Sequence, residues 1–250
     1  EEQAYIIGVQ ANIWGEYIQT PEYFEYMAFP RLLAMSEVQW TQPEHKDFES
    51  FARRLDKEFE RLDYCGVNAC RNFYEVNQAG AWNKSQQTYE VTLNTFCPDA
   101  DIYYAVNDST VNTSSSLYET PIPLDEDATI YSAVYRSGKP LGKVTRKSFA
   151  VNKATGCDYT CNPEAGWEHL NKGFGLTDGR RGYARDMRRW ISFYQDTVQI
   201  VVELKKPQKV KEVAFSSLWR PVNEIWPARA MGVSVSMDGQ TFIPVGTKRL

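Results

Sequence analysis

The chain has 250 residues but only 2 histidines and 5 cysteines, and no long apolar run. Because His45 and His169 are the only histidines, and no second cysteine pair lies near Cys157 and Cys161, we predict no metal site. No apolar stretch approaches the roughly 20 residues that cross a bilayer, so no membrane span is predicted. The formal net charge of -4 argues against a nucleic-acid partner. We also predict no organic cofactor.

The cysteines do not indicate a disulfide framework. Their number is odd, and several bridges are typical of much shorter secreted chains. Cys157 and Cys161 can form one local bridge if the protein is exported. Free, partly buried thiols are the alternative that we prefer. No basic and apolar leader opens the chain, so any export signal is expected upstream or already removed.

The first 80 residues indicate one strand followed by helices. Ala4–Val9 reads AYIIGV, the continuous apolar pattern of a parallel strand buried on both faces. Apolar residues at spacings of three and four from Phe48 to Leu62 predict an amphipathic helix. Gly66 follows where a left-handed cap is expected. One strand with its helices cannot bury both faces alone, so we expect neighbouring strands upstream.

Residues 81–151 change to the two-residue period of strands. Tyr89, Val91 and Leu93 alternate with polar residues, and the pattern recurs from Ile130 to Val134. Turn-forming segments such as NDSTVNTSSS separate these runs. The spacing predicts a small immunoglobulin-like β-sandwich.

Residues 152–250 are also predicted to be β-structure. Val213 and Phe215 alternate, and Asp238-Gly239 lies between two strand patterns, which is a strong hairpin signal. The predicted strands are fewer than a jelly roll normally has, so this domain is expected to be incomplete at its C-terminus.

The segment GVQANIWGEYI places Trp14 and Glu16 two residues apart. In a strand, such residues point to the same face. A large aromatic face beside a carboxylate suits a polar ring such as a sugar, and aromatic residues make up 14% of the chain. The alternative is a strand end whose Trp14 packs and whose Glu16 meets solvent.

This segment, followed by FPRLLAMSEVQW, resembles the last strand and helix of the catalytic barrel in family 20 glycoside hydrolases, the β-N-acetylhexosaminidases. ADIYYAVNDSTVNTSSSLYETPI resembles the small β module that often follows this barrel. LTDG, Trp190 and IWPARAMGVSVSMDG resemble part of a discoidin-like domain of the coagulation factor 5/8 type C group. The implied fold is a multidomain α+β fragment. It comprises the last βα unit of a (β/α)8 barrel (1–80), the sandwich (81–151) and a partial galactose-binding-like jelly roll (152–250).

The resemblance implies roles for the N-terminal pair. Glu16 would accept hydrogen bonds from two hydroxyls of a terminal N-acetylhexosamine, and Trp14 would form a wall of the acetamido pocket. In the family, the substrate's acetamido oxygen attacks the anomeric carbon, assisted by an Asp-Glu pair on barrel strand four. No segment of this chain matches that pair, and Asp125-Glu126-Asp127 reads as a solvated turn. We therefore assign no catalytic residue.

Three further groups have alternative interpretations. Glu37 lies in an apolar helix and is expected to be buried and paired with an Arg such as Arg31. The run GRRGYARDMRRW is expected to be a solvated loop rather than an anion site. Asp178 is expected to fix a turn rather than bind metal.

The loop LWRPVNEIWP contains Trp219, Arg220 and Trp226. Exposed aromatic side chains with an arginine in such a loop are candidates for glycan binding. Packing of these side chains beneath the loop is the alternative.

Two classes of function follow. The first is the C-terminal part of a secreted or periplasmic β-N-acetylhexosaminidase, whose partners are glycans with terminal N-acetylhexosamine and the upstream part of its barrel. The second is a non-catalytic carbohydrate-binding or spacer fragment.

Overall fold

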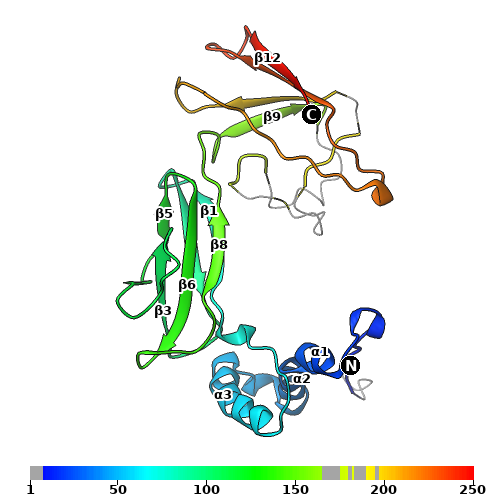
Figure 1. Ribbon diagram of the computed structural model, residues 1–250, viewed down its shortest axis with the longest axis vertical. Helices are drawn as coiled ribbons and strands as arrows, with labels where there is room; N and C mark the ends of the chain where they lie inside the picture. Colours follow the sequence, from blue (N-terminus) through cyan, green and yellow to red (C-terminus); the bar gives the residue numbers. More distant parts are fainter. Residues whose placement is uncertain (1–7, 165–174, 180–181, 183–189, 195–196) are drawn as a thin grey trace. The chain divides into compact units, whose positions relative to one another are not determined.

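A computed structural model shows a mixed α/β chain made mostly of strands (Figure 1). It describes residues 8–164, 175–179, 182, 190–194 and 197–250. Within these ranges, no helix is both long and apolar enough to cross a membrane. The chain divides into two compact units, which are described separately. The first comprises Glu1–Gln78, Leu93–Thr120 and Ile130–Lys147, and the second comprises Ala79–Thr92, Pro121–Thr129 and Ser148–Leu250.

The first unit contains the helices, whose ends follow local sequence signals. The described helices are α1 (Pro21–Ala28), α2 (Arg31–Trp40), α3 (Phe48–Tyr64) and the short 3-10 helices η2 (Gly15–Tyr17), η3 (Pro43–His45) and η4 (Asn72–Tyr74). The hydroxyl of Thr20 accepts the N–H of Tyr23 at the start of α1, and the carboxylate of Asp47 caps α3. After α3, Gly66 takes a left-handed conformation with φ 71°.

Helix α3 buries one face in a small apolar core. Leu55 and Phe59 are 3% and 2% exposed, and both pack with Ala69. The ring of Phe59 lies 5.9 Å from that of Phe73 and 5.3 Å from that of Tyr74. The amphipathic helix predicted from Phe48 onward is confirmed, and it ends two residues later than the apolar pattern.

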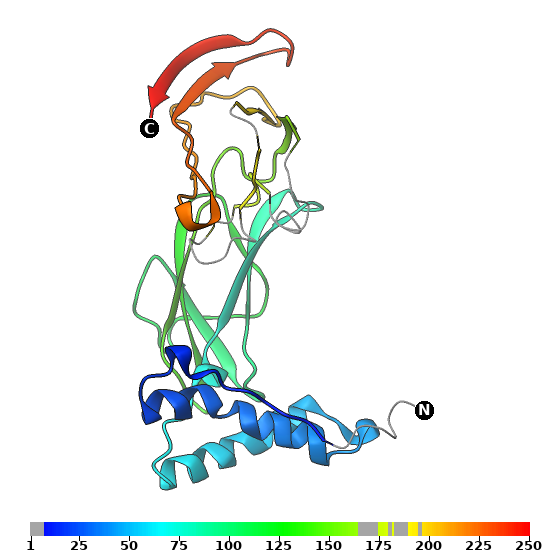
Figure 2. The ribbon, with the colours of Figure 1, turned by 90° about the vertical axis from the view of Figure 1, so that its right-hand side faces the viewer.

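The strands β1 to β8 form two sheets (Figure 2). One has the order β1–β2–β5, and the other has the order β4–β3–β6–β7 with β8 paired to β6. Tyr89, Val91 and Leu93 are buried on β2, as predicted. On β6, Ile130, Ser132 and Val134 are buried as predicted, but Ala133 is buried as well, so the alternation does not continue to the end of this strand. The strands are β1 (Asn77–Asn83), β2 (Thr88–Asn94), β3 (Asp101–Val106), β4 (Ser116–Leu117), β5 (Ile122–Leu124), β6 (Ala128–Arg136), β7 (Lys139–Pro140) and β8 (Thr145–Phe149).

A buried amide joins the two sheets within the first unit. Gln78 of β1 is 3% exposed, and its Nε2 donates to the hydroxyl of Ser132 at 2.8 Å. The same nitrogen donates to the carbonyl oxygens of Thr145 and Ile130, at 3.1 and 3.3 Å. Each of these acceptors belongs to the β3–β6–β8 sheet, so one side chain ties three backbone segments together.

The C-terminal part of the second unit contains two antiparallel strand pairs (Figure 1). Strand β9 (Asp158–Asn162) pairs with β10 (Gln199–Glu203), and β11 (Ala230–Val235) pairs with β12 (Ile243–Arg249). The hairpin predicted at Asp238-Gly239 is confirmed. The strand expected around Val213 and Phe215 is wrong, because both residues lie in irregular chain. Two alternating residues are too few to specify pairing without a partner strand.

The five cysteines are all free thiols. Cys157 is buried and Cys161 partly buried, so the preferred prediction of free thiols agrees with the structure. The division into three domains at 1–80, 81–151 and 152–250 stays a prediction, as do the barrel and jelly-roll assignments.

Candidate functional site

Trp14 and Glu16 lie at the start of the described chain, ahead of α1. Residues 8–14 form no regular strand, and residues 4–7 of the predicted strand lie outside the described residues. Gly15–Tyr17 instead form the 3-10 turn η2, in which the N–H of Ile18 donates to the carbonyl of Gly15 at 3.1 Å. A 3-10 turn has about three residues per turn, so positions two apart point in different directions. The shared strand face predicted for this pair is therefore not formed here.

The two side chains are nevertheless accessible. Trp14 is 74% exposed and the Glu16 side chain is also exposed. An indole and a carboxylate in this state can contact a ligand or another part of a protein without first breaking a packed core.

Glu37 on helix α2 pairs with a different arginine from the one predicted. Arg54 of α3 donates to both oxygens of Glu37, at 2.7 and 3.1 Å. This guanidinium lowers the pKa of Glu37 below its ordinary value. Arg31 donates instead to the carbonyls of Tyr26 and Met27 near the C-terminal end of α1. Glu37 is also only partly buried, with 20% of its side chain exposed.

A shallow cavity of about 480 Å³ adjoins this ion pair between α2 and α3. Its lining includes the apolar side chains of Leu33, Trp40 and Phe51, together with Arg54. Trp40 is 85% exposed, so the cavity is open at this side.

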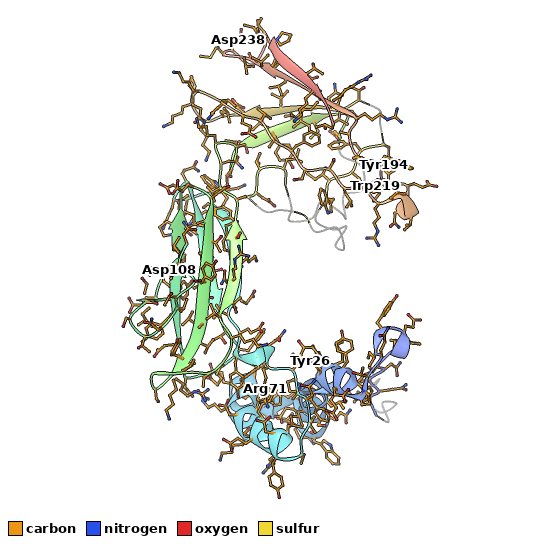
Figure 3. The ribbon with its side chains drawn as sticks, viewed as in Figure 1. Tyr26, Arg71, Asp108, Tyr194, Trp219 and Asp238 are labelled. Atoms are coloured by element: carbon orange, nitrogen blue, oxygen red, sulfur yellow. The ribbon has the colours of Figure 1, made fainter. Side chains whose placement is uncertain are left out.

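The loop that contains Trp219 and Trp226 turns back on itself, and Figure 3 labels Trp219 on it. Arg220 and Ile225 exchange backbone hydrogen bonds at 3.0 and 3.2 Å across the 3-10 helix η6 (Pro221–Asn223). This bridge is isolated, so Trp219 and Trp226 are the residues that flank it, one on each arm of the turn. They are 68% and 69% exposed, so packing beneath the loop is wrong for these rings.

The remaining acidic candidates act as turn-forming residues. Asp125, Glu126 and Asp127 form an exposed bend between β5 and β6, and Asp127 accepts the N–H of Val151 at 2.8 Å. The carboxylate of Asp178 accepts the N–H of Gly175 at 3.0 Å. The described residues contain no cluster of three His, Cys, Asp or Glu side chains that could hold a metal ion. Most of GRRGYARDMRRW lies outside the described residues.

Sequence reasoning missed one polar cluster entirely. Asp56 on α3 accepts hydrogen bonds from the phenol of Tyr74 and from Arg136 of β6, at 2.6 and 2.7 Å. Arg136 follows Asp56 by 80 positions, so no local spacing signals their contact.

Comparison with known proteins identifies two matched stretches. Residues 1–43 match the catalytic domain of glycosyl hydrolase family 20. Residues 77–146 match the chitobiase/beta-hexosaminidase C-terminal domain.

Two curated relatives carry related names. The chain is 48% identical over 68 residues to a beta-hexosaminidase of Porphyromonas gingivalis, covering 27% of this chain and 9% of that protein. It is 38% identical over 50 residues to a beta-N-acetylhexosaminidase of Cellulomonas fimi, covering 20% of this chain and 10% of that protein. The matched regions thus span a tenth or less of each relative. Two consecutive stretches of this chain are therefore similar to a family 20 catalytic domain and to the C-terminal domain of hexosaminidases.

Proposed function

We propose that this chain is the C-terminal part of a β-N-acetylhexosaminidase that removes terminal, non-reducing β-linked N-acetylhexosamine from glycans. The observation that carries the proposal is the order of the two matches: a family 20 catalytic segment precedes a hexosaminidase C-terminal domain. The relative from Porphyromonas gingivalis, at 48% identity over 68 residues, supports the same parentage.

In this proposal, Glu16 and Trp14 build one wall of the sugar site. The carboxylate of Glu16 accepts hydrogen bonds from two sugar hydroxyls, and the indole of Trp14 encloses the acetamido group. Both side chains belong to the matched catalytic segment, and both are exposed. Pairing of residues 4–14 with neighbouring barrel strands would convert η2 into a strand end, where barrel enzymes place their active sites.

The bond-cleaving groups lie outside this chain in this proposal. The substrate's own acetamido oxygen attacks the anomeric carbon, while an upstream Asp orients it and an adjacent Glu protonates the leaving oxygen. The isolated chain is therefore expected to be inactive. Pure protein incubated with a chromogenic β-N-acetylglucosaminide should release no more product than buffer alone. Turnover that persists after repurification would contradict this assignment.

The decisive test uses the full-length parent protein. Glu16→Gln removes the charge of a hydroxyl acceptor, which should lower kcat/KM by roughly 30- to 1000-fold, or about 2–4 kcal/mol. Glu22→Gln is a matched control, because Glu22 is an exposed carboxylate on neighbouring α1. An unchanged kcat/KM for Glu16→Gln, with the parent active, would mean that Glu16 does not contact the sugar.

A second candidate function is carbohydrate binding by the loop with Trp219 and Trp226. The observation that favours it is that two exposed indole rings flank the Arg220–Ile225 bridge, one on each arm of the turn. Titration of the chain with N-acetylated chito-oligosaccharides, followed by tryptophan fluorescence, tests it. Trp219→Ala should abolish the response, whereas Trp40→Ala removes an even more exposed ring on α2 and should preserve it. Binding unaffected by Trp219→Ala would eliminate this candidate.

Export to the periplasm or medium and the discoidin-like nature of residues 152–250 stay predictions. Fractionation of the producing cells tests the first, and the pairing of additional strands in a longer chain tests the second.

A further inference from the structure

The carboxylate of Asp56 joins three elements of the first unit that are distant in sequence. It lies on α3, and its two oxygens accept different donors: the phenol of Tyr74 at 2.6 Å and Nη1 of Arg136 at 2.7 Å. The other terminal nitrogen of Arg136 donates to the carbonyl of Pro98 at 3.0 Å and to the sulfur of Cys97 at 2.9 Å. We call Asp56, Tyr74, Cys97, Pro98 and Arg136 the junction cluster.

The cluster is shielded from solvent. The side chains of Asp56 and Arg136 are 25% and 31% exposed, and Cys97 is 4% exposed. Nε of Arg136 is also buried. A partly buried ion pair with further hydrogen bonds on both sides is costly to break, because one charge is then left without its partner. Exposed pairs do not have this property.

Two neighbouring contacts show that the elements approach closely. A Cβ atom added to Gly142, between β7 and β8, would lie 2.5 Å from the backbone oxygen of Tyr74. On the other side, the rings of Phe48 and Phe96 meet edge to face at 6.0 Å. Helix α3 and η4 therefore contact the chain around Phe96, Arg136 and Gly142 through apolar, charged and backbone groups.

We propose that the junction cluster makes helix α3 and the strands β3 and β6 one cooperative unit, with Arg136 as the positioning residue that holds the β2–β3 loop against Asp56. Strands β3 and β6 then brace helix α3 and do not move against it as a hinge. This inference does not depend on the proposed hydrolase activity, because it concerns only the chain's own contacts.

The thiol of Cys97 provides the readout. Burial raises the pKa of this thiol, and the positive charge of Arg136 opposes that rise. Removing Arg136 therefore raises the pKa further and slows alkylation if the cluster stays closed. If the cluster opens, the thiol reaches solvent and alkylation accelerates. A cluster that opens without Arg136 and a cluster that stays closed therefore predict opposite changes in the alkylation rate of Cys97.

The experiment measures alkylation rates of the cysteines by iodoacetamide labelling and peptide mass spectrometry under native conditions. Arg136→Met should raise the rate at Cys97 by about 10- to 100-fold, since it breaks a partly buried pair and the two hydrogen bonds to Cys97 and Pro98. The matched control is Arg61→Met, which breaks the exposed pair of Arg61 with Glu58 within helix α3. This control should change the Cys97 rate by less than about twofold.

Two other cysteines separate local opening from unfolding. Cys157 is buried in the second unit and should stay protected, while exposed Cys65 should react at an unchanged rate. If Arg136→Met also exposes Cys157, the variant has unfolded more widely, and a second variant, Gly142→Ala, is measured instead. The added methyl group pushes the chain at residue 142 away from Tyr74 and leaves every charge in place. The proposal is supported if Cys97 accelerates while Cys157 stays protected. It is overturned if the alkylation rate of Cys97 falls or stays constant in Arg136→Met. It is also overturned if Arg136→Met exposes Cys157 and Gly142→Ala then leaves the alkylation rate of Cys97 unchanged.

Discussion

Replacement of Phe59 by alanine tests whether the helices owe their stability to the α3 core. Phe59 is 2% exposed and packs with Leu55 and Ala69. It also contacts the rings of Phe73 and Tyr74. Phe→Ala in a packed core costs about 3–5 kcal/mol, from lost apolar burial and from the cavity that remains. Since small domains are stable by about 5–15 kcal/mol, the helices should lose a large share of their stability.

Urea unfolding followed by circular dichroism at 222 nm provides the assay. The three described α-helices all lie between residues 21 and 64, so this signal follows the region that contains the mutation. With a slope of about 2 kcal/mol per molar urea, the expected loss lowers the midpoint by about 1.5–2.5 M. Tyr64→Ala is the control, because Tyr64 ends the same helix and is 94% exposed. Its effect should stay within about 0.5 kcal/mol.

The comparison has a clear refutation. If Phe59→Ala and Tyr64→Ala shift the midpoint equally, or if Phe59→Ala costs less than about 1 kcal/mol, the core described around α3 does not hold the helices together.

Three further changes address the capping and pairing of the same helices. Asp47→Ala removes the acceptor of two backbone N–H groups at the start of α3 and should cost about 1 kcal/mol in urea unfolding, whereas an unchanged midpoint would contradict the cap. Gly66→Ala should lower the free energy of unfolding by about 1–2 kcal/mol, because a residue with a Cβ is disfavoured at a φ of 71° even where no other atom lies near that Cβ. An unchanged urea midpoint would mean that the turn relaxes to another conformation. Arg54 lowers the pKa of Glu37, so the stability that this pair contributes is present above the ordinary glutamate pKa of about 4.3 and is lost as pH falls through the lower native value. The difference in midpoint between wild type and Glu37→Gln should therefore be present at pH 7 and vanish near pH 2, and a difference that persists in acid would exclude the ion pair as its source.

The sequence predicted correctly those helices, strands and turns whose formation depends on residues close together in the chain. The apolar spacing from Phe48 to Leu62 and the glycine at position 66 sufficed for α3, because both depend on neighbours within a few residues. The alternation around Val91 sufficed for β2 for the same reason. Asp238-Gly239 likewise identified the turn between β11 and β12.

Features that depend on distant partners could not be predicted in this way. The strand expected before Trp14 needs neighbouring strands to satisfy its backbone, and the described residues 8–14 form no regular strand. Glu37 pairs with Arg54 across two helices, not with Arg31 of its own helix. The contact between Asp56 and Arg136 depends on how α3 meets the end of β6, which neither segment encodes alone.

The buried amide of Gln78 also constrains how the sheets can misalign during folding. Three acceptors converge on its nitrogen, and only residue 78 can supply that donor. A one-residue slip of β1 that brings Ala79 to this position puts no donor there and sends the Gln78 amide to the opposite face. Ser132 and two carbonyls would then lose a donor inside the protein. This misaligned pairing is thus disfavoured, and the polar residue acts as a check on strand alignment.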